Sequence, residues 1–313
     1  MSSNKQEYVI GVDGGASKTT IAVANLQGEI VEKAKGGPTN YLAVGEIRAR
    51  SNLKKIILPL LQKYQNIENI VFGFAGLNNK KDFLVFQRIV RSMIPKGVKF
   101  ALYNDAVIAM EATCEEKPRI LIVAGTGSSA LGQNGKKTIK AGGREFLLTD
   151  EGSAYDFGIR ALRSAVKSFD GRGQKTILES LVLKKAGAKD IPGLVMKVQM
   201  VWQKKPGEFK KYVASFTRLL GEAFIKKDKV AGAIIEQGAE ELFFGAEAVI
   251  KNLGIKNQKI CVGYVGSSFK LPFLKILLSA KIKRLAPKAY FISSIESVVG
   301  AVKLALKKNN AED

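Results

Sequence analysis

The stretch YVIGVDGGASKTTIAVANL, residues 8–26, places a glycine-rich turn between two apolar runs. Its Lys-Thr pair suggests a Walker A phosphate loop, but that motif requires glycine directly before the lysine, and Ser17 stands there. The residues after the turn alternate β-branched and small side chains, which predicts a strand and not a helix. The turn therefore joins two strands of a hairpin, where backbone N–H groups can bind an anion.

A similar pattern returns in the second half of the chain. PRILIVAGTGSSALGQNGKKTIK, residues 118–140, again reads as a strand, a tight glycine turn and a hairpin. In both halves, apolar runs rich in Val and Ile then alternate with amphipathic stretches, which indicates an α/β protein. The repetition predicts a duplicated fold with two lobes around a cleft, because ligands of α/β sheets bind at strand ends and domain interfaces.

The break in the apolar pattern at EEKP, residues 115–118, marks the expected boundary between the lobes. We assign residues 1–118 to the first lobe, together with a C-terminal helix at about 295–313. The second lobe takes residues 119–294, and a long helical insertion is expected within it at about 173–254.

Composition restricts the chemistry. The 313 residues include no histidine, so Ser-His triads and histidine-ligated zinc are excluded and a general base must be a carboxylate or, less often, Lys or Tyr. The net charge of +22 favours anionic partners, but the basic residues are spread along the chain, so no nucleic acid is expected as a partner. No apolar stretch has the length of a membrane span and no signal-peptide core is seen, so we expect a cytoplasmic protein without a membrane partner.

Three glycine elements are candidates for nucleotide binding. In the first turn, Gly14 and Gly15 allow positive φ and the close approach of a phosphate, and Asp13 is a candidate for holding Mg²⁺ through water. An ordinary hairpin explains any one turn equally well, but two turns at matching positions favour a nucleotide. The candidate residues in the first turn, the second turn and the GYVGSSF element are Gly14, Gly15, Ser17, Lys18 and Thr19; Gly125, Thr126, Gly127 and Ser128; and Gly266 and Ser267.

The order of five motifs then resembles a known family. VDGGASKT, YNDA, VAGTGSS, GGREFLLTDEGSAYDFG and GYVGSSF occur in sequence across nearly the whole chain. This order is similar to the N-acetylglucosamine kinase branch of the BadF/BadG/BcrA/BcrD ATPase family, in the sugar kinase/Hsp70/actin superfamily. The resemblance implies two RNase H-like, actin-like domains, ATP and Mg²⁺ as cofactors, and transfer of the γ-phosphate to a hydroxyl of an amino sugar such as N-acetylglucosamine or glucosamine. It also suggests a homodimer.

The resemblance carries roles to individual residues. Asp105 matches the catalytic aspartate that accepts the proton of the attacking hydroxyl, although an aspartate at this place also suits a helix N-cap. Asp150 matches the acid that accepts hydrogen bonds from the sugar, and Asn40 the sugar-binding asparagine. The remaining expected substrate contacts are Gly76, Leu77, Asn78, Gly142, Gly143 and Arg144.

Four positions depart from the family pattern. Gly143 is followed by Arg144 and Glu145 where the amino-sugar kinases have Gly-Trp-Gly, and Thr149 stands where glycine precedes the Asp-Glu-Gly-Ser. Ser267 replaces a usual glycine. These changes alter the expected sugar pocket and add charge, and Arg144 is a candidate partner for an anionic substrate group.

Three alternative functions remain open at this point. The family also includes activators of 2-hydroxyacyl-CoA dehydratases, but these need cysteines paired across a dimer, and Cys114 and Cys261 are poorly placed for that. A non-enzymatic actin-like ATP switch would leave Asn40, Asp105 and Asp150 without a role. A nucleic-acid binder is suggested by charge alone.

Overall fold

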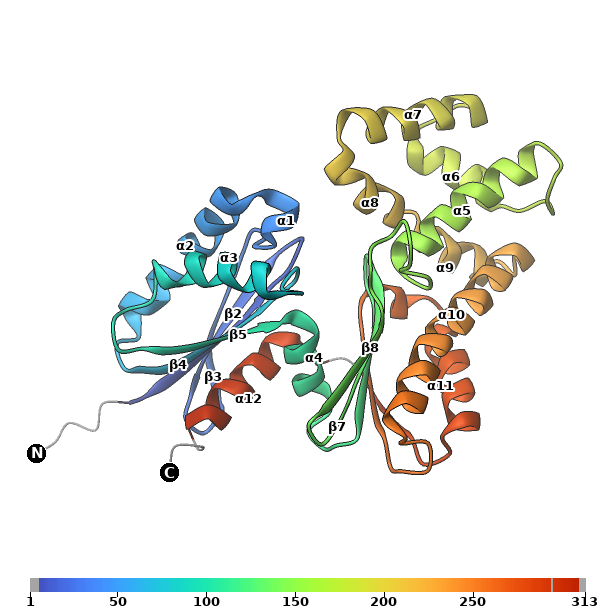
Figure 1. The fold of residues 1–313 in the computed structure, drawn as a ribbon. Coiled ribbons are helices and arrows are strands. Elements are labelled where there is room, and N and C mark those ends of the chain that lie inside the picture. The colour runs from blue at the N-terminus through green and yellow to red at the C-terminus, as the bar shows by residue number, and fades with distance from the viewer. Residues whose placement is uncertain (1–5, 294, 310–313) are drawn as a thin grey trace, which may run out of the picture. The chain divides into compact units, whose positions relative to one another are not determined.

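The computed structural model describes residues 6–293 and 295–309, which form two compact units. The first unit holds the described residues up to Glu115 together with the C-terminal helix, and the second runs from Glu116 to Ser293. Each unit is built on one five-stranded sheet (Figure 1).

The two sheets have the same topology. The strands of the first sheet are β1 (Tyr8–Gly14), β2 (Thr19–Asn25), β3 (Ile30–Gly36), β4 (Ile67–Phe74) and β5 (Lys99–Asn104). Those of the second are β6 (Arg119–Ala124), β7 (Ser128–Asn134), β8 (Lys137–Gly142), β9 (Cys261–Val265) and β10 (Tyr290–Ile292). The orders are β3-β2-β1-β4-β5 and β8-β7-β6-β9-β10, with an antiparallel hairpin on one side and parallel strands on the other in both. The predicted duplicated α/β fold is confirmed.

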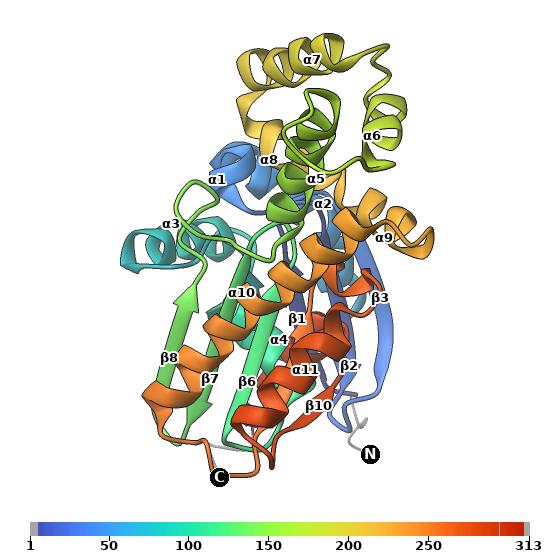
Figure 2. The same cartoon turned by 90° about the vertical axis from the view of Figure 1, so that its right-hand side faces the viewer.

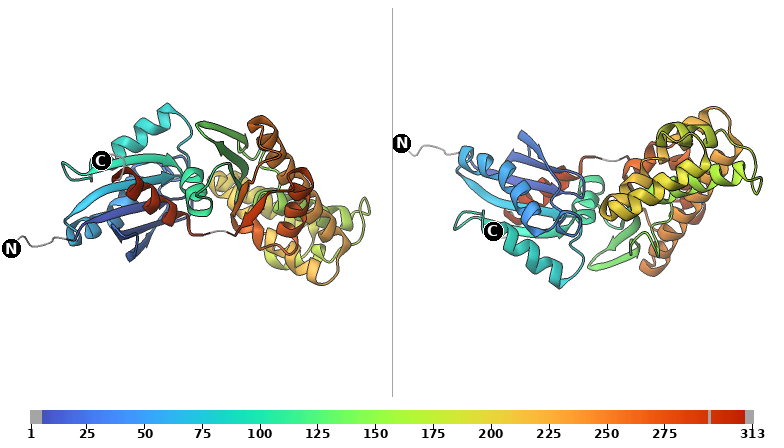
Figure 3. Two further views of the ribbon diagram at one scale, coloured as in Figure 1. Left: turned by 90° about the horizontal axis from the view of Figure 1, so that it is seen from below. Right: turned by 90° about the horizontal axis from the view of Figure 1, so that it is seen from above.

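In the first unit, helices cover both faces of the sheet. The helices are α1 (Tyr41–Val44), α2 (Glu46–Lys63), α3 (Lys80–Arg91), α4 (Asp105–Thr113) and α12 (Ser297–Asn309). One face packs its β-branched and aromatic side chains against apolar residues of α2 and α3. The other face packs against α4 and α12, which lie side by side (Figure 3).

Two glycines bring α12 close to its neighbours. A Cβ on Gly11 of β1 would lie 2.7 Å from the backbone nitrogen of Val302. A Cβ on Gly300 would lie 1.8 Å from the carbonyl oxygen of Ile108 in α4. The C-terminal helix α12 therefore makes direct backbone contacts with β1 and α4. These contacts cover the second face of the first sheet.

In the second unit, helices pack on the sheet and also on one another. They are α5 (Ala154–Phe169), α6 (Leu178–Ala186), α7 (Ile191–Lys204), α8 (Pro206–Ala214), α9 (Thr217–Ile225), α10 (Lys229–Leu253) and α11 (Leu274–Leu285), with a short 3₁₀ helix η1 (Ser267–Lys270). The helices α10 and α11 cross the sheet and share its apolar core (Figure 2).

The expected helical insertion at 173–254 contains two different parts. The helices α6, α7 and α8 surround α5 beyond the end of the sheet and have a small apolar core of their own (Figure 2). The last helix of the segment, α10, packs instead on β7 and β8 and belongs to the sheet core. Within residues 6–293 and 295–309, no helix combines the length and apolar character needed to cross a membrane.

Candidate functional site

Two carboxylates lie near the carboxyl ends of the parallel strands in the first unit. Asp13 is the next-to-last residue of β1, and Asp105 directly follows β5. The pKa of the Asp13 carboxyl is raised to about 6, first by burial and then by the nearby charge of Asp105, against a lowering by Lys18. The two acids therefore interact electrostatically, and a cation between or beside them would relieve their repulsion.

The first glycine turn closes on itself and on the loop that follows β3. The N–H of Gly15 donates to the carbonyl of Lys18 at 2.9 Å, while the Gly15 carbonyl accepts from the backbone N–H of Thr39 and of Asn40. Ser17 and Lys18 are exposed at the tip of the turn. Backbone hydrogen bonds of Gly15 therefore hold the turn in place, while its tip at Ser17 and Lys18 is exposed to solvent.

The glycines of the first turn do not use the positive φ that glycine allows. Neither Gly14 nor Gly15 adopts a positive φ. Gly14 is required by packing, because a Cβ there would lie 2.4 Å from both the Phe74 ring and the Thr39 hydroxyl. The glycine pair therefore reflects a close approach within the protein as well as any approach of a ligand.

Thr19 is fully buried and its side chain is engaged inside the protein. The Thr19 hydroxyl donates to the carbonyl of Gly37 at 2.8 Å and lies 3.0 Å from the Thr39 hydroxyl. Thr19 was a candidate phosphate ligand, but in the structure its side chain holds the 37–40 loop against β2.

Two of the predicted substrate residues lie together in this unit. Asn40 caps α1, its side-chain oxygen accepting from the N–H of Leu42 at 3.0 Å. Gly76 has φ of +93°, and a Cβ on it would lie 2.7 Å from the Asn40 side-chain oxygen. The glycine in the loop after β4 therefore makes room for the asparagine.

The N-cap of α4, a role that the sequence also suggested for Asp105, is the preceding residue Asn104. Asn104 is the N-cap of α4 and accepts from the N–H of Ala106 at 2.9 Å. Asn104 also donates to the carbonyl of Leu77 at 3.0 Å and to the side chain of Asn78 at 3.4 Å. The Asp105 oxygen accepts from the same Ala106 N–H at 3.0 Å, so α4 does not depend on Asp105 for its cap.

Sequence reasoning missed Asp82, a buried acid that organises the loop containing Asn78. Its carboxylate accepts from the N–H groups of Asn78 and Asn79 and from the hydroxyl of Tyr41 at 2.6 Å. Burial alone would raise the pKa of Asp82, but these hydrogen bonds hold it below its usual value. The hydrogen bond from the Tyr41 hydroxyl to Asp82 raises the pKa of Tyr41 to about 12. The signal was present as an Asn-x-x-Asp capping box at the start of α3.

In the second unit, Asp150 lies against the second glycine turn. Asp150 is 4% exposed and accepts from the backbone N–H of Ser128 at 3.1 Å. A Cβ on Gly127 would lie 2.8 Å from the Asp150 carboxylate. The Ser128 hydroxyl donates to the carbonyl of Glu151 at 2.6 Å. The structure therefore brings together the predicted sugar-binding acid and the predicted phosphate turn at 125–128.

The third glycine element also meets this turn. Gly266 has φ of +122°, and a Cβ on it would lie 2.3 Å from the carbonyl carbon of Ala124 and 2.5 Å from the nitrogen of Gly125. Ser267 is exposed, whereas the hydroxyl of Ser268 is buried and has no hydrogen-bond partner among the residues that the structure describes. The two glycine elements expected to hold one nucleotide are thus in direct backbone contact.

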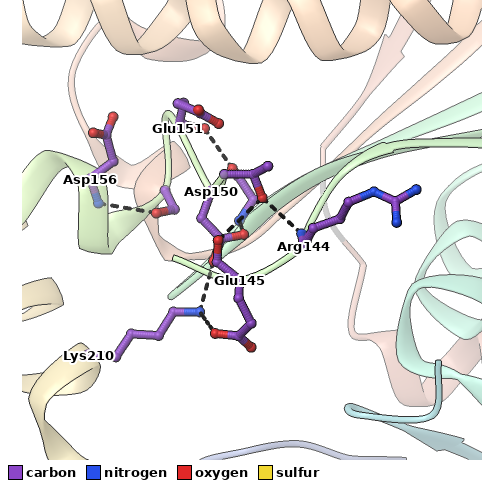
Figure 4. A network of polar contacts seen from close by, with 9 residues as sticks. Arg144, Glu145, Asp150, Glu151, Asp156 and Lys210 are labelled. Carbon is purple, nitrogen blue, oxygen red and sulfur yellow. Dashed lines mark hydrogen bonds and ion pairs between the residues drawn. The ribbon is translucent and has the colours of Figure 1, made fainter. Parts of the chain in front are cut away.

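The segment between β8 and α5 has unusual backbone geometry. Glu145 and Asp150 adopt positive φ, at 84° and 75°, as do Gly142, Gly143 and Gly152. Non-glycine residues rarely adopt this conformation, and such strain is concentrated at functional sites. The backbone N–H of Arg144 donates to the Thr149 hydroxyl at 2.9 Å, so Thr149 closes the loop. The Arg144 side chain points away from Asp150 (Figure 4).

Lys210 of α8 is a second residue that sequence reasoning missed. Its Nζ lies 2.8 Å from Asp150 Oδ2 and 3.7 Å from Glu145 Oε2 (Figure 4). It also lies 5.4 Å from the centre of the Phe146 ring. Nothing in the local sequence of α8 indicated this role, because Lys210 is sixty positions from Asp150 and one of many lysines.

The carboxylates of the first unit fit Mg²⁺ bound together with a phosphate ligand. Mg²⁺ in phosphate-transferring sites is held by one or two carboxylates, substrate phosphates and water. The described residues contain no cluster of three acidic or cysteine ligands that would hold a metal alone. Asp13, with Asp105 close enough to raise its pKa, provides the smaller donor set that suits a metal arriving with a nucleotide.

The chain is similar to known proteins over most of its length. The family model described as BadF/BadG/BcrA/BcrD ATPase matches residues 10–305. The chain is 34% identical over 265 residues to the N-acetylmuramic acid/N-acetylglucosamine kinase of Clostridium acetobutylicum, covering 83% of this chain and 85% of that protein. It is 27% identical over 317 residues to the N-acetyl-D-glucosamine kinase of Dictyostelium discoideum, covering 96% and 98%.

A solved structure shares the fold. The crystal structure of a candidate N-acetylglucosamine kinase from Chromobacterium violaceum aligns with a TM-score of 0.76 at 22% identity, covering 96% of this chain and 99% of that one. At this identity the likeness concerns the fold, and it extends over both five-stranded sheets.

Proposed function

Because the chain belongs to the BadF/BadG/BcrA/BcrD ATPase family, we propose that it is an ATP-dependent kinase that phosphorylates a hydroxyl of an amino sugar. The observation that carries this proposal is the pair Asp13 and Asp105 at the carboxyl ends of β1 and β5, with the pKa of Asp13 raised by burial and by Asp105. The relatives named as kinases of N-acetylated amino sugars support the substrate class.

In this proposal Asp105 is the general base. Phosphoryl transfer depends mainly on positioning and charge neutralisation, and one carboxylate accepts the proton of the attacking hydroxyl. Asn104 is the N-cap of α4, so the helix does not require Asp105 as its cap. Asp13 would hold Mg²⁺, which supplies charge neutralisation on the phosphates when bound.

The glycine turns are assigned to the nucleotide. In the first unit, backbone N–H groups between Gly14 and Lys18 would donate to phosphate oxygens, and the Lys18 ammonium would add charge. Within the second unit, the turn 125–128 is assigned to phosphate, and Gly266 with Ser267 is assigned to adenosine. The contact between Gly266 and Gly125 supports assigning both to the same nucleotide.

Each unit, taken by itself, supplies candidate polar ligands for the sugar. Asn40 and the loop of Gly76 and Asn78 are the candidates in the first unit, supported by the contact between Asn40 and Gly76. Asp150 and Gly143 are the candidates in the second unit. Arg144 is assigned to the outer part of the pocket, because its side chain points away from Asp150 (Figure 4).

The test is an assay of ADP release with glucosamine, N-acetylglucosamine, N-acetylmuramic acid and glucose, repeated with Asp105→Asn. We expect turnover with at least one amino sugar and a loss of at least about 100-fold in kcat for the variant. ATP affinity, measured by calorimetry, should be retained in Asp105→Asn. Near-normal turnover by this variant would contradict the assignment of the base.

A further inference from the structure

In the ion pair of Asp150 and Lys210, the carboxylate is more deeply buried than the ammonium group. Asp150 is 4% exposed, so its charge is poorly screened by solvent. One carboxylate oxygen accepts from Ser128 and the other is paired with Lys210 at 2.8 Å. A buried carboxylate without a cation partner is strongly unfavourable, so Lys210 neutralises Asp150 in the folded protein.

Lys210 is held in this position from more than one side. Its ammonium lies over the Phe146 ring, which itself packs edge-on against Tyr155 with ring centres 4.8 Å apart. Glu145 approaches at 3.7 Å, but its side chain is 74% exposed and its charge is therefore well screened. Asp150 is thus the dominant electrostatic partner of Lys210.

A sugar bound to Asp150 must lie beside Lys210. A carboxylate oxygen accepts more than one hydrogen bond, so a sugar hydroxyl can share Oδ2 with the Lys210 ammonium. Groups that share one acceptor lie within a few ångströms of each other, where a fixed charge acts strongly on a charged substituent. The Lys210 ammonium therefore interacts electrostatically with any charged substituent of a sugar bound to Asp150.

We propose that Lys210 is a specificity-determining residue that selects amino sugars whose nitrogen is acylated, with a neutral or acidic substituent, over sugars that carry a free ammonium group. The inference rests on the proposed function and on Asp150 as a sugar ligand. With Lys210 present, the pair has no net charge and the ammonium of the lysine repels a second ammonium. Without it, the buried Asp150 carboxylate would attract a cationic sugar and repel an acidic one.

The test compares ratios of kcat/KM within each variant, so that a general loss of activity cancels. N-acetylglucosamine and glucosamine are assayed at a pH that keeps the amine of glucosamine protonated, and N-acetylmuramic acid provides an acidic third substrate. We expect the wild-type protein to prefer N-acetylglucosamine, and Lys210→Met to lower the ratio of N-acetylglucosamine to glucosamine by about tenfold or more. Preference for N-acetylmuramic acid over glucosamine should fall in the same variant.

Three further variants make the test specific. Lys210→Arg keeps the charge and should retain the wild-type ratio, and Lys211→Met removes an exposed charge from the same helix and should also retain it. Lys210→Gln removes the charge but keeps a polar side chain beside Asp150, and it should lower the ratio as Lys210→Met does. It supplies the same readout if Lys210→Met does not fold.

The outcomes separate the two proposals. A ratio within twofold of wild type in Lys210→Met, or in Lys210→Gln where Lys210→Met does not fold, would overturn the role of Lys210 while leaving the kinase intact. A wild-type preference for glucosamine would also overturn it. Absence of phosphorylation of every amino sugar by the wild-type protein would instead overturn the proposed function.

Discussion

At the scale of single residues, Asp13 has a carboxyl whose protonation differs between the folded and unfolded chain. Its folded pKa of about 6 lies above the ordinary value near 4, mainly because of burial. The folded state therefore binds an additional proton between about pH 4 and 6. The raised pKa of Asp13 therefore does not lower the free energy of unfolding below about pH 4. Above about pH 6 it lowers the free energy of unfolding by its full amount.

Replacing Asp13 by Asn should therefore stabilise the protein without nucleotide at neutral pH. A shift of about two pKa units corresponds to at most about 3 kcal/mol, which gives the upper limit of the gain at pH 7 and above. The gain should vanish below about pH 4. Thermal unfolding of both proteins across this pH range is the measurement, and equal melting temperatures at pH 7 would contradict the raised pKa.

Ser268 offers a second prediction at this scale. Its hydroxyl is buried and finds no hydrogen-bond partner within the described part of the chain, and an unsatisfied buried hydroxyl costs about 1–3 kcal/mol. Ser268→Ala should raise the free energy of unfolding by about 1 kcal/mol, measured by chemical denaturation. The matched control is Ser279→Ala, which removes a hydrogen bond to the Tyr264 hydroxyl and should lower stability. A destabilising effect of Ser268→Ala would count against this explanation.

At the scale of elements, the packing of α12 on α4 tolerates no added side chain at Gly300. A Cβ there would lie 1.8 Å from the Ile108 carbonyl oxygen, so the two helices would have to separate. Gly300→Ala should lower the free energy of unfolding by about 3 kcal/mol or more, despite the higher helix propensity of alanine. The measurement is chemical denaturation monitored by circular dichroism.

Gly232 in α10 is the matched control for this prediction. A Cβ on Gly232 would meet only the Phe224 ring, at 3.8 Å, an ordinary contact distance. Gly232→Ala should therefore be neutral or stabilising by up to about 1 kcal/mol. Equal effects of the two substitutions would show that α12 is not held by close backbone contact.

The same scale shows what could be predicted from the sequence. Both hairpins and the alternation of strands and helices were predictable because short-range turn residues and apolar periodicity determine them. The role of α10 was not, since an amphipathic helix looks alike whether it covers a sheet or other helices. Lys210 was missed because tertiary packing brings it to Asp150, and the capping box of Asp82 did not indicate its contact with Tyr41.

At the scale of the whole molecule, the duplication places equivalent turns at equivalent strand ends. The turn between β1 and β2 and the turn between β6 and β7 occupy the same topological position in the two sheets. The first turn alone could not identify the chemistry, because its glycines are partly explained by packing against Phe74. Its meaning for function comes from the second copy, from Asp105 and from membership of the family.

The central claim is that a phosphoryl group passes from ATP to an amino sugar on this protein. The most direct measurement uses ATP labelled with ¹⁸O in its γ-phosphate, incubated with Mg²⁺ and N-acetylglucosamine or N-acetylmuramic acid and analysed by mass spectrometry. The account predicts a labelled sugar phosphate with the wild-type protein and none with Asp105→Asn. Label found only in inorganic phosphate, with no phosphorylated sugar, would contradict it.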